Sequence, residues 1–141
     1  MNNSDSAVIS ISILYRRTTI WEESYACDIG LSAAQIPVIS AICRYNGISQ
    51  SELCNCLNMD KGTIAKTISN LEKNEFVIRQ KNPKDQRAYF IIPTQKALDV
   101  YPIIVKKGSD WFQILTKDMT DDERFQFEYL LAKAAENATT K

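Results

Sequence analysis

The sequence contains no histidine. Because histidine is the commonest general base and a frequent zinc ligand, its absence removes every Cys/His nucleophile pair and every metal site that uses an imidazole. Glycine is also scarce, with 4 residues in 141, and no glycine-rich phosphate loop is present. We find no paired catalytic carboxylates in a suitable context either. We therefore expect a protein that is not an enzyme and that needs no metal and no cofactor.

Long hydrophobic runs are absent as well, since no apolar stretch approaches the ~20 residues that span a bilayer. The first residues, MNNSDSAV, lack the basic and then apolar layout of a signal peptide. The hydrophobic fraction of 45% and the charged fraction of 24% are typical of a folded globular protein. We expect a cytoplasmic protein in which residues 1–141 form a single domain.

The four cysteines are Cys27, Cys43, Cys54 and Cys56. Cys54 and Cys56 are two positions apart, so on a helix their side chains point in nearly opposite directions and cannot hold one metal ion. We expect buried free thiols rather than a redox or metal site. The acidic neighbour of Cys27 disfavours a reactive thiolate at that position.

The charged residues are unevenly distributed, although 17 basic and 17 acidic side chains balance over the whole chain. Residues 60–90 contain seven basic and four acidic side chains, whereas residues 98–137 contain five basic and eight acidic ones. A basic middle and an acidic tail predict that only the middle of the chain faces a polyanion.

The most informative stretch is residues 60–75, DKGTIAKTISNLEKNE. Ile64, Ile68 and Leu71 recur at helical spacing and predict one buried face, and Asp60 can cap the first turn. The opposite face would carry basic or hydrogen-bonding side chains, namely Lys61, Thr63, Lys66, Thr67, Asn70 and Lys73. A solvated surface helix would have the same pattern, so the surrounding elements must decide the interpretation.

Capping boxes mark the starts of three further helices. They are Ser32-x-x-Gln35, Ser49-x-x-Glu52 and Thr120-x-x-Glu123, and they predict helices over 33–45, 50–57 and 121–137. The last of these helices should bury its apolar residues, including Phe127, Leu130 and Leu131. Because only three residues, Asn58, Met59 and Asp60, connect the 50–57 helix to the helix that follows, the two form a predicted helix-turn-helix.

A hairpin follows this pair. Residues 76–81 alternate in polarity, Pro83 occupies the second position of a predicted type I turn over 82–85, and residues 87–93 are rich in aromatic and β-branched side chains. A long helix over 95–116 comes next. At the other end of the chain, serines alternate with isoleucines near residue 10 as in a strand, but the longer spacing beyond them favours a helix over 7–27.

A helix-turn-helix followed by a basic hairpin is a winged helix, and the sequence resembles the MarR family of bacterial transcription regulators over nearly its whole length. The matching residues are Leu31-Ser32-x-x-Gln35, Gly47 to Leu53, the helix from Asp60 to Glu72, Phe76-Val77-x-Arg79, Asp85-x-Arg87 and Thr94-x-Lys96. The family pattern would have glycine in place of Glu75, leucine in place of Pro93 and glycine in place of Ala97.

The resemblance implies a mainly α fold with a small β-hairpin wing, in which residues 31–94 form the DNA-binding lobe. It also implies a homodimer held by the helices 7–27 and 95–137, with a recognition helix in the major groove and a wing over the minor groove. Family members commonly respond to small phenolic or anionic effectors, and some respond through a cysteine near the N-terminus. The aromatic residues on segments near such an effector pocket are Tyr15, Trp21, Tyr25, Tyr45 and Trp111, although aromatics at helical spacing are more often core residues.

The residue chemistry suggests a division of labour on DNA. Thr63, Thr67 and Asn70 can contact base edges, while the lysines of the same helix can hold phosphates. In addition, Ser49 and Gln50 open a helix whose exposed N–H groups attract phosphate. In the wing we expect contacts from Lys81, Lys84, Asp85 and Arg87.

Two of the wing's charged residues have alternative interpretations. Arg87 can enter a narrow minor groove, with Asp85 either orienting its guanidinium or forming a simple surface ion pair with it. Arg79 can form a salt bridge to Glu72 or Asp85, or it can contact a phosphate.

We therefore predict a sequence-specific regulator of transcription that binds double-stranded DNA. It would act as a ligand-responsive repressor and bind a pseudo-palindromic operator as a homodimer. The alternative is a winged-helix adapter that binds proteins and not DNA. The exposed side chains of residues 61–73 and of the wing distinguish the two, because bases and amides suit DNA whereas apolar residues suit a protein groove.

Overall fold

The computed structural model describes residues 3–139. The chain divides into two compact units, Met1–Val105 and Lys106–Lys141. The first unit contains α1 (Asn3–Ala26), two short 3₁₀ turns at Cys27–Ile29 and Ala33–Gln35, α2 (Ile36–Tyr45), α3 (Gln50–Leu57) and α4 (Lys61–Lys73). Three strands complete it, β1 (Ile48–Ser49), β2 (Val77–Asn82) and β3 (Asp85–Pro93). The unit boundary lies within α5 (Gln95–Leu115), which α6 (Asp121–Thr139) follows.

The core of the first unit lies between α2, α3, α4 and the sheet. Ile64, Ile68 and Leu71 of α4 are fully buried there, as the helical spacing of these three residues predicted. Leu53 of α3, Ile39 and Ile42 of α2, and Phe76, Val77 and Ile91 around the sheet fill the same cluster. A three-helix lobe with one continuous apolar centre therefore holds the strands in place.

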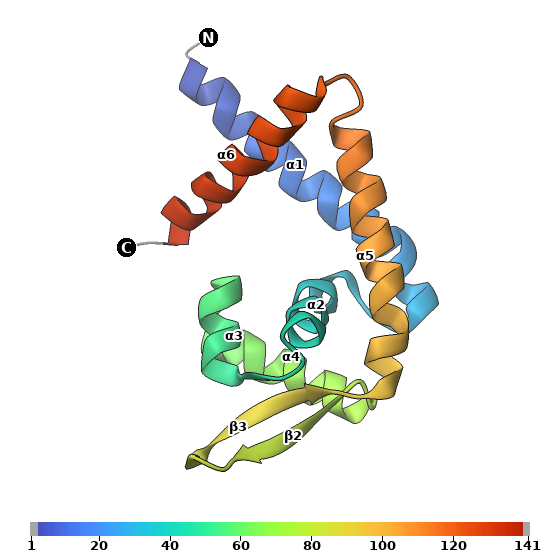
Figure 1. The fold of residues 1–141 in the computed structure, drawn as a ribbon, viewed down its shortest axis with the longest axis vertical. Helices are drawn as coiled ribbons and strands as arrows, with labels where there is room; N and C mark the ends of the chain where they lie inside the picture. Colours follow the sequence, from blue (N-terminus) through green and yellow to red (C-terminus); the bar gives the residue numbers. More distant parts are fainter. Residues whose placement is uncertain (1–2, 140–141) are drawn as a thin grey trace. The chain divides into compact units, whose positions relative to one another are not determined.

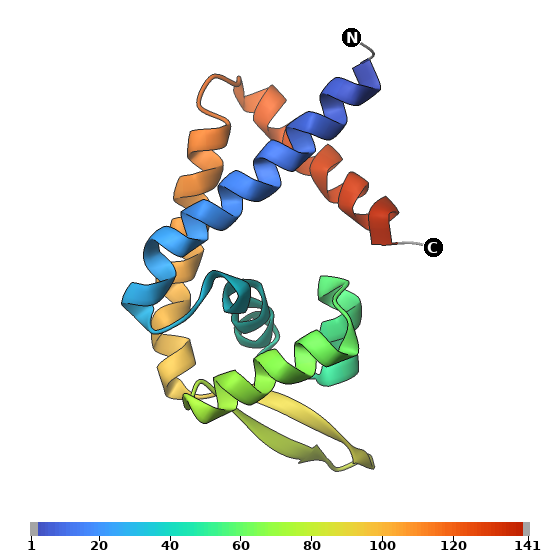
Figure 2. The same cartoon turned by 180° about the vertical axis from the view of Figure 1, so that it is seen from behind.

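The sheet has the antiparallel order β1-β3-β2. Lys81 pairs with Tyr89 and Arg79 with Ile91, and the register shifts between Lys81 and Asn82, next to the turn. Figure 1 shows β2 and β3 as a hairpin that leaves the helical lobe, with its tip at the end away from α5. Figure 2, from behind, shows α4 above the same hairpin.

Most predicted elements are confirmed, with instructive differences at their ends. The predicted 33–45 helix begins as a 3₁₀ turn, and the α-helix starts only at Ile36, with Pro37 in its first turn. The N-terminal segment is a helix and not a strand, and it leaves Ile9, Ile11 and Ile13 exposed. The strand β1, which has only two residues, was not predicted from the sequence.

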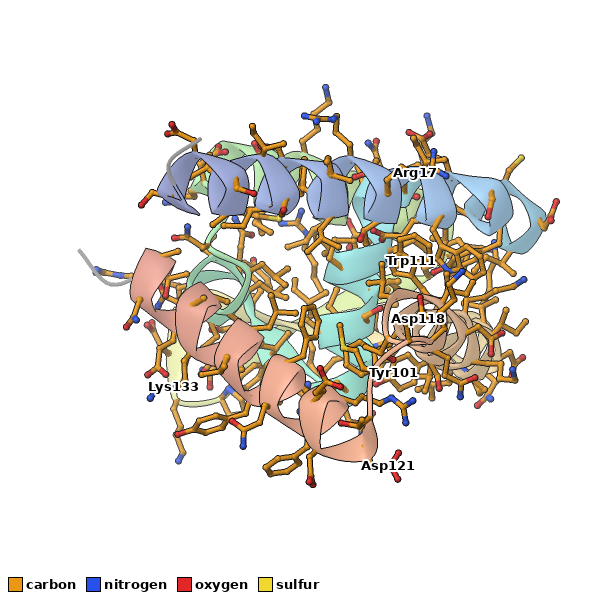
Figure 3. All side chains as sticks on the ribbon, turned by 90° about the horizontal axis from the view of Figure 1, so that it is seen from above. Arg17, Tyr101, Trp111, Asp118, Asp121 and Lys133 are labelled. Atoms are coloured by element: carbon orange, nitrogen blue, oxygen red, sulfur yellow. The ribbon has the colours of Figure 1, made fainter. Side chains whose placement is uncertain are left out.

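The second unit contains the C-terminal part of α5 and the whole of α6, and a buried hydroxyl forms hydrogen bonds with both helices. Thr116 is fully buried, and its Oγ1 donates to the carbonyl of Phe112 at 2.8 Å and accepts from Nε of Arg124 at 3.1 Å. The capping box at Thr120 and Glu123 is present and starts α6 as predicted. Figure 3 labels Asp121 near the start of this helix and Lys133 farther along it.

The prediction that α6 buries its apolar residues is wrong for a single chain. None of the residues described in α6 is buried, and Phe125, Tyr129, Leu130 and Leu131 are all about half exposed or more. The spacing of these residues identifies an apolar helix face, but it does not say what covers the face. Within residues 3–139, no single helix is long and apolar enough to cross a membrane, and only a pair of helices bent by 96° passes that test together.

Candidate nucleic-acid interface

The start of α4 is fixed by Asp60. Its Oδ2 accepts from the main-chain N–H of Thr63 at 2.9 Å, and its Oδ1 accepts from the hydroxyl of Thr63 at 2.6 Å. These bonds, with the side-chain bond from Thr63 the strongest cause, hold the pKa of Asp60 below its usual value. The carboxylate therefore stays charged at neutral pH, and its negative charge interacts favourably with the positive end of the helix dipole.

The outward face of α4 carries Lys61, Lys66, Asn70 and Lys73, which are all exposed. The two threonines of this face are more restricted than the sequence suggested. Thr67 is half-buried and donates its hydroxyl to the carbonyl of Thr63 at 2.9 Å. Since both threonine hydroxyl hydrogens are used within the helix, these side chains can meet a base only as acceptors or through their methyl groups.

The end of α4 turns on a residue in the left-handed region. Glu75 has φ of +65°, its N–H donates to the carbonyl of Glu72 at 3.0 Å, and the N–H of Phe76 donates to the carbonyl of Leu71 at 2.9 Å. Glycine usually occupies this kind of helix end because a Cβ atom is strained there. The carbonyl of Glu75 then accepts the hydroxyl of Thr94 at 2.6 Å, which ties the end of α4 to the start of α5.

Arg79 fastens β2 to α4. Its Nε lies 3.6 Å from Oε1 of Glu72, and its Nη2 donates to Oγ of Ser69 at 3.2 Å. The structural interpretation of Arg79, a salt bridge to Glu72, is thus confirmed. This side chain therefore holds β2 against α4.

The wing turn is shaped by two side-chain acceptors. Oδ1 of Asn82 accepts from the N–H of Lys84 at 2.9 Å, and Oδ1 of Asp85 accepts from the main-chain N–H of Arg87 at 3.0 Å. Asp85 was expected to meet the guanidinium of Arg87, but it contacts the backbone instead, because a short carboxylate reaches the N–H two residues ahead more easily. Lys81, Lys84 and Arg87 remain exposed around this turn.

The start of α3 faces the wing. Ser49 caps the helix, since its Oγ accepts from the N–H of Glu52 at 3.1 Å and Oε2 of Glu52 accepts from the N–H of Ser49 at 3.1 Å. Ser49 is also a residue of β1 and pairs with Phe90 of β3. The sheet and the helix cap therefore share one residue, Ser49.

A surface cavity of about 410 Å³ lies between α3, the start of α4 and β3. Four of the predicted DNA-binding residues line it, namely Ser49, Gln50, Lys61 and Arg87. The other lining residues were not identified from the sequence; they are Ser51, Cys54, Asn55, Ala88 and Tyr89. Only the pairing of β3 with β1 brings Tyr89 opposite α3, so no local pattern could have identified it.

The five predicted effector residues do not line this cavity. Tyr25 is buried in the core of the first unit, with Trp21 packed against that core, whereas Tyr15 and Tyr45 are exposed. Trp111 belongs to the second unit (Figure 3). For Tyr25 and Trp21 the core role that the sequence left open is thus observed.

The cysteines differ in exposure. Only Cys43 is buried, and burial raises the pKa of its thiol to about 11. Cys54 is half-buried, and Cys27 and Cys56 are exposed, so the expectation that the thiols are buried is wrong for these three. Among residues 3–139, no group of three or more Cys, Asp or Glu side chains is placed to hold a metal ion.

Comparison with known proteins gives consistent matches. A family model described as the MarR family matches residues 29–88, a range that includes the helix pair α3 and α4 and the first wing strand. The multiple antibiotic resistance protein MarR of Escherichia coli (strain K12) is 32% identical over 110 residues, which cover 77% of this chain and 76% of that protein.

Solved structures agree with this match. A MarR transcriptional regulator from Methanosarcina mazei Go1 has a TM-score of 0.88 and 31% identity, and the match covers 95% of this chain and 96% of that chain. A MarR family regulator from Listeria monocytogenes, solved in complex with a 26mer DNA, has a TM-score of 0.89 and 26% identity, with coverage of 94% and 88%.

Proposed function

Because this chain belongs to the MarR family and is a regulator of transcription, we propose that it binds double-stranded DNA as a homodimer and represses the adjoining genes. The observation that carries the proposal is the outward face of α4. Three fully buried apolar side chains anchor this helix, and none of its exposed side chains is apolar. They are three lysines, the neutral polar residues Thr63, Ser69 and Asn70, and one acid, Glu72, beside a basic wing. An adapter that binds a protein groove would instead expose apolar residues here.

The geometry supports a specific mode of binding. A helix of 13 residues is about 20 Å long and fits the major groove, which is roughly 12 Å wide. Lys66 and Lys73 would hold phosphates, and Asn70 can make two hydrogen bonds to an adenine edge. Arg87 would reach the adjacent minor groove, whose negative potential favours a guanidinium when the groove is narrow.

The dimer is supported by apolar side chains that a single chain leaves exposed. In the first unit they lie on α1 and include Val8, Ile9, Ile11 and Ile13, and in the second unit they lie on α6. Exposed apolar surface of this extent marks an interface, and the acidic residues near α6 keep that region away from DNA. Sedimentation equilibrium at micromolar concentration should give twice the chain mass of 16.0 kDa, and a folded monomer would contradict the proposal.

A dimer of this kind would bind a pseudo-palindromic operator with half-sites ~10 base pairs apart, centre to centre. Fragments of genomic DNA selected on the purified protein and then sequenced should show this symmetry. We also propose that a small aromatic or anionic effector releases the DNA, with Tyr15 and Tyr45 as candidate contacts because they are exposed. Since the partner is DNA, we place the protein in the cytoplasm.

The test separates phosphate contacts from base contacts. Binding to a panel of operators with single-base changes is titrated at two salt concentrations. Lys66→Ala should weaken binding to all operators alike and lower the salt slope by about one for each phosphate that the variant no longer neutralises. Asn70→Ala or Thr67→Ala should instead change the preferred base, at about 1–3 kcal/mol on the best operator.

Arg87→Ala should weaken all operators by a similar factor, and most where the flanks are rich in A·T pairs. Lys117→Ala, which removes an exposed lysine of the second unit, is the matched control for charge. If the four interface variants bound as wild type does, the DNA-reading surface would lie elsewhere.

A further inference from the structure

The cavity between α3, α4 and β3 has lining groups that fit an anion. None of its nine lining residues is acidic, and Lys61 and Arg87 supply two positive charges. Within the described part of the chain, neither of these side chains forms an ion pair. Ser51, Asn55 and Tyr89 add neutral donors, so the cavity offers both charge and hydrogen bonds to one occupant.

The position of the cavity between α3, α4 and β3 indicates which anion it binds. On duplex DNA, a major groove and the neighbouring minor groove are separated by one sugar-phosphate backbone. If α4 lies in the major groove and the wing lies in the minor groove, that backbone must cross the surface between them. The cavity occupies this position, since its walls are the start of α4, the start of α3 and the wing strand β3.

We propose that this cavity is the seat of the DNA backbone between the two grooves, and that Asn55 and Tyr89 hold its phosphates together with Lys61. The proposal rests on the proposed function and adds two contact residues that the sequence did not identify. Tyr89 is suited to the role because its side chain is 40% exposed and its strand neighbour across the hairpin is the basic Lys81. Asn55 is exposed on the face of α3 that lines the cavity.

A built-in reporter allows a direct test. Cys54 lines the cavity, whereas Cys56, two residues along the same helix, is exposed and does not line it. The wild-type protein is treated with iodoacetamide, with and without duplex DNA fragments in excess at about 50 mM salt, where non-specific binding is strong. The labelling rate of each cysteine is then measured by mass spectrometry of its peptide.

Bound DNA should slow the labelling of Cys54 at least about fivefold and leave Cys56 and Cys27 within about twofold of their free rates. A third arm contains 10 mM inorganic phosphate in place of DNA. If phosphate alone protected Cys54 as well as the duplex does, the cavity would be a small-anion site and the proposal would be overturned. If the duplex bound and Cys54 stayed fully reactive, the proposal would also fail, while the proposed function would stand.

Substitutions provide the second measurement. Tyr89→Phe and Asn55→Ala should each reduce affinity about three- to tenfold on every operator, because each removes a neutral donor to a charged phosphate. The salt slope should stay unchanged, since no charge is removed, whereas Lys61→Ala should lower it. Gln80→Ala is the control, because Gln80 is exposed and pairs with Phe90, on the opposite face of the hairpin from Tyr89.

Circular dichroism of each variant establishes that it is folded before its affinity is compared. Wild-type affinity for both Tyr89→Phe and Asn55→Ala would overturn the assignment. Failure of the wild-type protein to bind any duplex is a different result. It would remove the proposed function, and this inference with it.

Discussion

Substituting Glu75 with glycine should stabilise the protein. Glu75 stands at the end of α4 with φ of +65°, where a residue with a Cβ atom carries about 1–2 kcal/mol of strain. Glycine removes this strain but gains freedom in the unfolded chain, which offsets about 0.5–1 kcal/mol. The net gain should therefore be about 0.5–1 kcal/mol per chain. The two hydrogen bonds that close the helix, from the N–H groups of Glu75 and Phe76, do not depend on the side chain and should persist.

Urea denaturation followed by circular dichroism measures this difference. All variants must be compared at one protein concentration, because the stability of the proposed dimer would depend on concentration. With an m-value of about 2 kcal/mol/M, the midpoint for Glu75→Gly should rise by about 0.25–0.5 M. The matched control is Glu75→Ala, which removes the same carboxylate but keeps the Cβ atom and its strain.

The comparison of the two variants decides between conformation and charge. If strain is the cause, Glu75→Gly should be more stable than wild type, and Glu75→Ala should not. If both variants were stabilised equally, the gain would come from removing a negative charge, and the argument from the left-handed conformation would be refuted. A lower midpoint for Glu75→Gly would refute it as well.

Three further predictions concern the helix start, the core and the thiols. Because the pKa of Asp60 is lowered from its ordinary value of 3.8, its ionised carboxylate stabilises the fold above about pH 3.8. This contribution is lost as the pH falls through the folded-state pKa. The difference in Tm between wild type and Asp60→Asn should therefore shrink between pH 5 and pH 3. Ile68→Val should lower the free energy of unfolding by about 1 kcal/mol in urea denaturation, because Ile68 is fully buried, and no change would mean that the packing beneath α4 is loose. With a pKa of about 11, only about one in a thousand Cys43 thiols is ionised at pH 8. Iodoacetamide should therefore modify the exposed Cys56 long before Cys43, and equal labelling rates would contradict the burial of Cys43.

The parts of the fold that depend on local patterns could be predicted from the sequence. The bounds of α3 and the cap of α4 follow from Ser49, Glu52 and Asp60, because capping joins residues only three positions apart. The buried face of α4 follows from the spacing of its isoleucines. The family resemblance added the arrangement of these helices, which spacing alone does not give.

The parts that depend on tertiary contacts could not be predicted. A strand of two residues such as β1 has no pattern of its own and exists only because β3 pairs with it. For the same reason Tyr89 could not be placed beside Asn55. Asp85 shows a different limit, since its carboxylate had two acceptable donors and only the conformation of the turn decided between them. The exposed face of α6 shows that a sequence can specify an apolar surface without specifying what binds to it.

Ser49 has a consequence for how the protein meets DNA. This one residue caps α3 and at the same time forms part of the sheet that carries the wing, while Arg79 fastens the other wing strand to α4. The two helices and the hairpin are thus braced at both ends, and we expect them to move as one rigid body. If these protein elements do not change shape on binding, the DNA must bend or twist to fit them. Base steps that deform easily should then be favoured even where no side chain contacts them. The deformability of the operator would thus contribute to the sequence preference of the protein.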